Sequence, residues 1–249
     1  MLRNERQNLI YSILTREGSA KACELAAELY TSESSIRRDL VKMESAGIVK
    51  RSCGRAYPVG TTNGVVPFSS RSYSAADEKR AIAKKAITLI KEGDVIFLDQ
   101  SSTSYFLAVE LMSFGHVTVL TNNIEILSLL SHTDKTVYCS GGSVSPKNKN
   151  CLIGNGASAS FSSLYADLAF FSANAISNEG VITDCTEEEI FVRRAMLASA
   201  KRRVFLCDSS KVNRVSVWRQ CTLSDIDIAV TDGCAFDKFK SSFTNLKVL

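Results

Sequence analysis

The residues best suited to chemistry form two groups: basic side chains within the first sixty residues, and hydroxyl, amide and charged side chains spread over residues 99–211. The first group centres on the adjacent residues Arg37 and Arg38. Guanidinium groups donate several hydrogen bonds in a fixed fork, which suits phosphate oxygens and the edges of guanine bases. Two adjacent arginines are also common on any solvated helix face, so their meaning depends on the elements that carry them.

The elements around this arginine pair predict two short helices joined by a tight turn. Apolar residues recur at helical spacing over residues 3–16, 21–29 and 33–45. Ser32 is expected to cap the third helix, because its hydroxyl can accept from backbone N–H groups two or three residues on. Two helices of this kind, the second one basic, are typical of a helix-turn-helix that reads the major groove of DNA. In the third helix, the residues expected to face inward are Ile36, Leu40 and Met43. The apolar residues at helical spacing in the first two helices are Leu9, Ile10, Ile13, Leu14, Ala22, Leu25, Ala26 and Leu29.

The segment after the third helix predicts an antiparallel hairpin. Residues 48–51 and 56–58 read as two short strands around the turn 52–55, and they carry basic side chains that are available to phosphates. Three helices and a basic hairpin in this order predict a small α+β winged helix-turn-helix domain over residues 1–58. The residues expected to contact double-stranded DNA are Ser32, Ser34, Ser35, Arg37, Arg38, Lys42, Lys50, Arg51 and Arg55.

The distribution of charge agrees with an anionic partner for this first domain. Residues 1–60 hold ten Lys and Arg against seven Asp and Glu, whereas the remaining residues hold twenty against nineteen. The basic excess therefore lies almost entirely in the first quarter of the chain.

The rest of the chain, residues 77–249, predicts an α/β domain with a mainly parallel sheet. Short apolar runs alternate with helical patterns, and strands of this kind are typical of a sheet that is buried on both faces. Residues 59–76 are rich in Gly, Ser, Thr and Asn and are expected to form a linker. Helices are expected over 77–91, 103–112, 123–130, 155–164 and 187–200, strands over 94–99, 117–120, 136–140, 168–172, 203–208, 226–231 and 246–249, and a small hairpin around 180–183.

Three of the expected strand ends carry the second group of chemically suggestive residues. In open sheets, ligands bind beyond the C-terminal ends of the strands. Residues 99–103 place hydroxyls and N–H groups at the start of a helix, which suits a phosphate, although a simple helix cap has the same pattern. Gly141 and Gly142 allow a close backbone approach, or merely form a turn. Asp208 and Lys211 offer a carboxylate for sugar hydroxyls and an ammonium for a phosphate, although a lone lysine is usually a surface residue.

The remaining reactive residue types give no metal or catalytic pattern. The eight cysteines, at positions 23, 53, 139, 151, 185, 207, 221 and 234, include no Cys-x-x-Cys pair, and His116 and His132 are the only histidines. We expect free, mostly buried thiols and neither a metal nor a cofactor. No apolar run is long enough for a membrane span and the N-terminus lacks a signal-like core, so a cytoplasmic protein without membrane contacts is expected.

Two segments of the first domain resemble a known pair of sequence patterns. They are residues 32–40, S-E-S-S-I-R-R-D-L, and residues 47–56, G-I-V-K-R-S-C-G-R-A. The DeoR family of sugar-responsive bacterial repressors reads V-S-x-x-T-I-R-R-D-L followed by G-x-[IL]-x-R-x-H-G-G-A. This chain has Thr31 for the valine, Ser35 for the threonine, Cys53 for the histidine and Arg55 for the second glycine.

The resemblance continues into the second domain. The family's effector domain, similar in fold to sugar-phosphate isomerases, reads F-L-D-x-G-T-T, V-T-N, G-G, I-G and D-x-S-K. This sequence has F-L-D-Q-S-S-T at 97–103, L-T-N at 120–122, Gly141-Gly142, I-G at 153–154 and D-S-S-K at 208–211. An arginine common soon after Gly-Gly is missing, and Lys147 or Lys149 could replace it.

The resemblance implies a repressor of a carbohydrate operon that a phosphorylated sugar controls, assembled as a homodimer or homotetramer. The departures from the family patterns suggest a ligand other than the commonest ones. The residues expected to bind the effector are Asp99, Ser101, Ser102, Thr103, Asn122, Gly141, Gly142, Asp208 and Lys211.

Two other functions remain open at this point. One is an active sugar-phosphate isomerase or deaminase, for which carboxylates such as Asp99, Asp184 and Glu187–Glu189 are available as acid and base groups. The run 187–189 is more simply the acidic first turn of a helix. The other is a DNA-binding protein whose second domain only oligomerises. The operator, the particular sugar phosphate, and repression as against activation are left open too.

Overall fold

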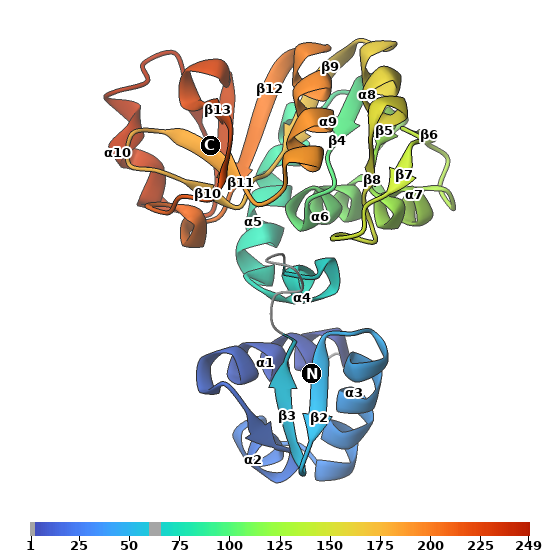
Figure 1. Cartoon of the computed structure of the whole chain (residues 1–249), viewed down its shortest axis with the longest axis vertical. Helices are drawn as coiled ribbons and strands as arrows, with labels where there is room; N and C mark the ends of the chain where they lie inside the picture. The colour runs from blue at the N-terminus through green and yellow to red at the C-terminus, as the bar shows by residue number, and fades with distance from the viewer. Residues whose placement is uncertain (1–2, 60–65) are drawn as a thin grey trace. The chain divides into compact units, whose positions relative to one another are not determined.

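The computed structural model describes residues 3–59 and 66–249. The chain divides into two compact units, residues 1–76 and 77–249 (Figure 1). Within the described ranges no helix combines the length and the apolar character that a membrane crossing requires.

The first unit has the predicted three helices and hairpin. The helices are α1 (Arg3–Glu17), α2 (Ala22–Glu28) and α3 (Glu33–Ser45), and the hairpin is β2 (Val49–Ser52) and β3 (Arg55–Pro58). A strand that was not predicted, β1 (Ala20–Lys21), pairs antiparallel with β3 and gives the order β1-β3-β2. Two residues are too few for an alternating pattern to be recognised, which explains the omission.

The core of this unit follows the helical spacing of the sequence. Ile10, Leu14 and Leu25 are fully buried with Ile36 and Met43 of α3. Leu9 shares the helical apolar spacing of α1, but its side chain is 43% exposed. Four apolar residues over two turns cover more of the helix circumference than the contact with α2 and α3 can bury.

Ser32 is the N-cap of α3, as predicted. Its hydroxyl oxygen accepts from the backbone N–H of Ser35 at 3.3 Å, and the helix begins at the next residue, Glu33. The cap defines where the basic helix starts.

The segment expected as a linker contains a helix, α4 (Phe68–Tyr73). The Tyr73 hydroxyl donates to Gln7 Oε1 at 3.1 Å, and its ring lies 6.0 Å from the ring of Tyr11, so α4 packs on α1. Six residues do not produce a readable helical period, and the polar composition hid the helix. Residues 60–65 of the expected linker lie outside the described residues, and the linker role stays a prediction.

The second unit is built on a seven-stranded sheet in which every neighbouring pair of strands is parallel. This confirms the predicted fold class. In spatial order the strands are β15 (Lys247–Val248), β14 (Ile228–Thr231), β12 (Ala200–Cys207), β9 (Ala166–Phe171), β4 (Val95–Leu98), β5 (Thr118–Thr121) and β6 (Thr136–Cys139).

Both faces of this sheet are covered by helices, because the side chains of each strand alternate between two cores. In β4, Phe97 belongs to the core with α8 (Asn155–Ser162), α9 (Glu187–Ala198) and α10 (Asp237–Lys240), while Ile96 and Leu98 belong to the opposite core. That opposite core includes α5 (Ala76–Ala86), α6 (Ser102–Leu111) and α7 (Ile124–Leu130). Figure 1 shows α8 and α9 together in front of the sheet.

Smaller elements complete the second unit. The predicted hairpin near 180–183 is present as β10 (Ala175–Ile176) and β11 (Val181–Asp184), and β11 also pairs with β13 (Trp218–Thr222), which was not predicted. Because β13 is an edge strand with several exposed side chains, it lacks the apolar run that marks the central strands. The remaining elements are the hairpin β7 (Ser143–Val144) and β8 (Leu152–Ile153) and the 3-10 turns Ile87–Leu89, Ser209–Lys211, Leu223–Asp225 and Cys234–Phe236.

Candidate nucleic-acid interface and candidate ligand site

The outer face of α3 presents the basic residues that the sequence predicted. Ile36, Leu40 and Met43 are buried, whereas Arg37, Arg38 and Lys42 are exposed. At the helix start, the Ser32 hydroxyl lies 3.1 Å from that of Ser34 and 2.9 Å from that of Ser35, so the three serines form a polar end to the basic face.

The two arginines of α3 are not locked in the interior. Arg37 pairs with Glu33 one turn earlier at 2.6 Å, but 69% of its side chain is exposed. Exposed pairs at this spacing contribute only about 0.3–0.5 kcal/mol, so a phosphate can displace Glu33. Arg38 donates to the Ser34 carbonyl and the Ser35 hydroxyl, each at 3.3 Å, and within the described chain no carboxylate lies in ion-pair distance of it.

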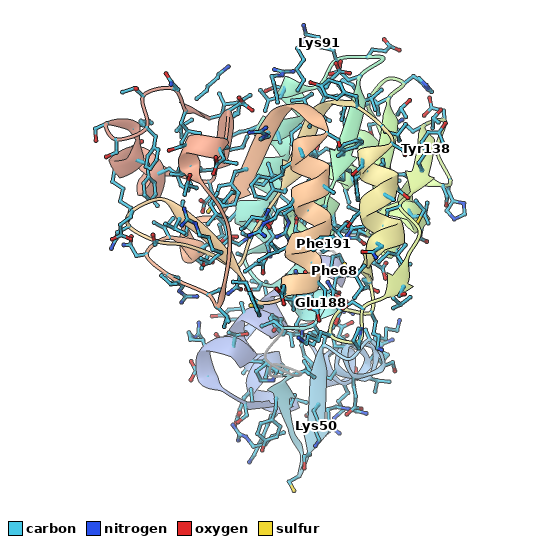
Figure 2. All side chains as sticks on the ribbon, turned by 45° about the horizontal axis from the view of Figure 1, so that its top comes forward. Lys50, Phe68, Lys91, Tyr138, Glu188 and Phe191 are labelled. Atoms are coloured by element: carbon cyan, nitrogen blue, oxygen red, sulfur yellow. The ribbon has the colours of Figure 1, made fainter. Side chains whose placement is uncertain are left out.

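The three predicted basic residues of the hairpin differ in availability. Lys50 is exposed on β2 (Figure 2). Arg51 donates to both carboxylate oxygens of Glu44, through its backbone and its side chain, and these bonds lower the pKa of Glu44. Arg55 turns back toward the domain and donates to the hydroxyl and the carbonyl of Ser19, each at 3.0 Å. Arg55 therefore holds β3 against the segment after α1.

A groove of about 370 Å³ lies between the hairpin and the starts of α2 and α3. Four cations line it, Lys21, Arg37, Arg51 and Arg55, against the single carboxylate of Glu33. An anionic partner would meet an excess of positive charge there.

One residue of the R-R-D-L sequence has a structural role that the sequence did not reveal. Asp39 is buried and accepts from Arg6 Nε at 2.6 Å and from Gln7 Nε2 at 3.3 Å. The acid therefore ties α3 to α1 from within, while its two arginine neighbours face solvent.

The expectation of mostly buried thiols is wrong. Of the seven cysteines whose surroundings the structure describes, Cys23, Cys53 and Cys139 are exposed, and only Cys151 and Cys207 are buried. Cys23 and Cys53 also line the basic groove. Burial raises the pKa of the Cys207 thiol, and it raises the pKa of Cys221 to about 12.

The second unit gathers the predicted ligand residues at one edge of its sheet. Because the strands are parallel, their carboxyl ends all lie at the same edge. Asp208 follows β12, Ser172 follows β9, Asp99 follows β4 and Asn122 follows β5, in that spatial order. Neighbouring strands are separated by about 4.8 Å.

Asp99 lies at the centre of this edge, and its carboxylate is fully occupied by the protein. Oδ1 accepts from the Ser101 N–H at 3.1 Å and from the Ser104 hydroxyl at 2.6 Å. Oδ2 accepts from the Ser172 N–H at 3.2 Å and from Arg193 Nε at 3.0 Å. A carboxylate offers about four acceptor positions, so Asp99 positions the surrounding loops rather than offering oxygens to a ligand.

Arg193 of α9 is the buried cation that the sequence analysis missed. It donates to Asp99, to Asp184 Oδ2 at 2.9 Å and to Gln220 Oε1 at 3.3 Å. Burial lowers its pKa, but the carboxylates of Asp184 and Asp99 outweigh burial and raise it. Arg193 thereby connects the main sheet to the small sheet that contains β11 and β13.

Lys211 points toward the same edge from the turn after β12. Its Nζ donates to the Ser172 hydroxyl at 2.6 Å and lies 3.4 Å from Asp208 Oδ2. Burial acts to raise the pKa of Asp208, but Lys211, the Ser210 hydroxyl and Lys79 together lower it. Contacts through Ser172 and Asp99 link the Lys211 ammonium to the loop that begins α6.

The start of α6 has the features of an anion site. Ser101 caps the helix, since its hydroxyl accepts from the Ser104 N–H at 3.0 Å. The first N–H groups of a helix lack intrahelical partners and attract anions. Thr103 is buried, and its hydroxyl has no hydrogen-bond partner among the described residues.

A chain of buried polar side chains lies at the ends of β4 and β5. Asn122 Nδ2 donates to Gln100 Oε1 at 3.4 Å, and Gln100 Nε2 donates to Glu189 Oε2 at 2.9 Å. Asn148 Nδ2 donates to Glu189 Oε1 at 3.2 Å. Only Asn122 was predicted as a site residue. Glu189 lies in the acidic first turn of α9, as predicted, but its side chain is buried. In the loop after β7, Asn148 is buried, whereas Lys147 and Lys149 are not.

Gly142 of the Gly-Gly pair has a packing role. Gly142 adopts a φ of +96°, and a Cβ there would overlap the Ile153 carbonyl oxygen. The glycine allows this turn to approach β8 closely, which explains its presence without any ligand.

Comparison with known proteins agrees with both units. The family model of the DeoR-like helix-turn-helix domain matches residues 6–61, and that of the DeoR C terminal sensor domain matches residues 74–233. The chain belongs to the DeoR family. The transcriptional regulator YgbI of Escherichia coli is 32% identical over 93% of this chain and 91% of its own length. The transcriptional repressor GlcR of Bacillus subtilis is 31% identical over 93% of this chain and 89% of its own length.

These DeoR-family relatives are described as regulators and not as enzymes. Among solved structures, ribose 5-phosphate isomerase A of Methanocaldococcus jannaschii is similar over 56% of this chain and 55% of that chain, with 20% identity and a TM-score of 0.43. The class of the second unit rests on its own parallel sheet, since a likeness of this size adds nothing to it.

Proposed function

We propose that this DeoR-family protein is a DNA-binding transcriptional regulator that represses a carbohydrate-utilisation operon, and that a phosphorylated sugar releases or modulates its binding to the operator. The observation that carries the proposal is the exposed basic face of α3, the second helix of the helix-turn-helix. A recognition helix needs cations that solvent and DNA can reach, and a rigid core behind them.

Arg38, Lys42 and Lys50 are the cations best placed for DNA, because within the described ranges none of them is in an ion pair. Arg37 and Arg51 join them once the phosphates displace Glu33 and Glu44. The serines at the start of α3 supply further donors.

The effector would bind at the carboxyl edge of the sheet. Its phosphate would take the first N–H groups of α6, the Thr103 hydroxyl and the Lys211 ammonium. Asn122 and Asp208 would face the sugar, while Asp99 and Gly142 support the loops. A homodimer or homotetramer suits a palindromic or repeated operator, and a ligand controls DNA binding only if it binds two arrangements of the assembly unequally.

The test is a gel-shift titration of the full chain with DNA from upstream of its own gene. Arg38→Ala is expected to weaken binding roughly tenfold to a hundredfold, because a base-reading arginine contributes about 1–3 kcal/mol. Arg16→Ala is the matched control, since Arg16 is exposed in the same unit and pairs with Glu17 and Glu28. Wild-type affinity in both Arg37→Ala and Arg38→Ala would disprove the assignment of α3.

A further inference from the structure

Four buried side chains at the carboxyl ends of β4 and β5 form what we call the acceptor cluster: Gln100, Asn122, Asn148 and Glu189. Each is at least nine-tenths buried, and they come from four separate segments of the chain. The phosphate contacts of the proposed function use none of them. Their hydrogen bonds to one another leave some of their acceptor oxygens without a donor among the described residues.

The partners of the cluster determine which way its amides face. The Glu189 carboxylate only accepts, so Asn148 must turn its NH₂ group toward it. The Leu152 carbonyl also only accepts, and it takes the NH₂ group of Asn122 at 3.1 Å. The amide oxygens are therefore the atoms left over. Asn122 Oδ1 and Asn148 Oδ1 have no hydrogen-bond partner among the described residues.

Unmatched buried acceptors require donors. Buried polar atoms in proteins are nearly always hydrogen-bonded, to the protein, to water or to a ligand. Glu189 adds to the shortage, because among the described residues its two oxygens accept from Gln100 and Asn148 alone, and a carboxylate can accept from about four donors. A group that completes this cluster must bring hydrogen-bond donors with it.

The charges around the cluster oppose a further anion. Arg193 is the nearby buried cation. It pairs with Asp99 and Asp184 and also interacts electrostatically with Glu189, so one cation is shared among three carboxylates. Within residues 3–59 and 66–249, no lysine or arginine lies in ion-pair distance of Glu189. A carboxylate or phosphate placed against Glu189 would therefore meet unbalanced negative charge at low dielectric.

We propose that the acceptor cluster is the specificity subsite of the effector site: it receives the hydroxyl-bearing end of a sugar monophosphate and rejects a second anionic group. The inference rests on the proposed function, which supplies the phosphate end at α6 and Lys211. The two ends fit one ligand, because Gln100 of the cluster and the start of α6 both follow β4, while Asn122 follows the adjacent strand β5, one strand spacing of about 4.8 Å away. A five- or six-carbon sugar phosphate spans such a distance.

The test measures the thermal stability and the ligand affinity of the full chain with matched pairs of sugar phosphates. The pairs are ribose 5-phosphate with 5-phosphoribonate, glucose 6-phosphate with 6-phosphogluconate, and fructose 6-phosphate with fructose 1,6-bisphosphate. A ligand that binds the folded state raises the Tm. We expect the sugars that bind to be monophosphates with a neutral far end, and the partner with a second anion to bind at least tenfold more weakly.

Substitutions at two neighbouring glutamates of α9 distinguish the effect of the buried Glu189 from the effect of removing any negative charge from this helix. Glu189→Gln keeps the shape and removes the charge, so the preference for the neutral ligand should shrink about tenfold. Glu188→Gln is the matched control, because its side chain is 51% exposed and faces Lys147 at a distance of 4.0 Å (Figure 2). It should leave the preference unchanged. Trp218 fluorescence verifies that each variant is folded.

The outcomes distinguish this inference from the function beneath it. If no sugar phosphate of the panel binds, both the effector function and the subsite are disproved. If a monophosphate binds and Lys211→Ala abolishes its binding, the function stands. The subsite is then disproved if the acid or the bisphosphate binds as tightly as its neutral partner, or if Glu189→Gln leaves the preference unchanged.

Discussion

The basic face of α3 and the carboxyl edge of the seven-stranded sheet differ in how their charges are held. On α3, Arg38 and Lys42 are exposed on a single helix, and Arg37 is in a solvent-exposed pair. At the sheet edge, Asp99 and Arg193 are buried and bonded to residues from several segments. A substitution on α3 should therefore change binding and leave stability intact, whereas one that breaks the buried ion pairs of Arg193 should destabilise the second unit.

Arg193→Met should show the largest effect. Removing this cation leaves two buried carboxylates facing each other, and breaking a buried pair in this way costs about 3–5 kcal/mol. The measurement is urea unfolding followed by fluorescence, because Trp218, the single tryptophan of the chain, lies in β13 and reports on the second unit alone.

The adjacent residue provides the control. Arg194 is exposed and donates to the Arg219 carbonyl at 2.7 Å, so Arg194→Met should cost less than about 1 kcal/mol. Equal losses in the two variants would mean that the sheet edge is held no more tightly than the surface, and the contrast with α3 would fail.

The two regions also differ in how far the sequence could predict them. On α3, the cap at Ser32 and the stripe of Ile36, Leu40 and Met43 follow from spacing along one element, so the face could be predicted residue by residue. The strand ends at Asp99 and Asn122 were found in the same way. The partners Arg193 and Glu189 were not, because they approach from a helix more than sixty residues away, and the helical period of α9 shows only that one side of it is buried.

Asp39→Ala tests whether a buried ion pair also stabilises the first unit, beneath the exposed basic face of α3. Asp39 is buried, but its partner Arg6 keeps some contact with water, so the expected loss is about 2–3 kcal/mol, below that for Arg193. Amide hydrogen exchange measured segment by segment over α1 and α3 follows this unit, because circular dichroism would report on the helices of both units together. Glu33→Ala, which breaks only the exposed pair with Arg37, should cost less than about 0.5 kcal/mol. A loss that small in Asp39→Ala would disprove its role as a tie between α3 and α1.

The smallest effect we expect is a change in the pH dependence of the second unit. The pKa of Asp208 lies below its usual value, because Lys211, Ser210 and Lys79 together outweigh its burial. A carboxyl with a lowered pKa in the folded state stabilises that state above its unfolded pKa of about 3.9, and the contribution is lost as the pH falls toward the folded pKa. In Asp208→Asn, the free energy of unfolding should therefore fall less steeply below about pH 4 than in the wild type.

Trp218 fluorescence during urea unfolding at each pH gives the free energy of unfolding of both proteins. Asp237→Asn, which removes an exposed pair with Lys240 at 2.6 Å, should keep the wild-type slope. If the free energy of unfolding falls equally steeply with pH in Asp208→Asn and the wild type, Lys211 does not lower the pKa of Asp208. The evidence that Lys211 is held at the phosphate end of the proposed effector site would then be removed.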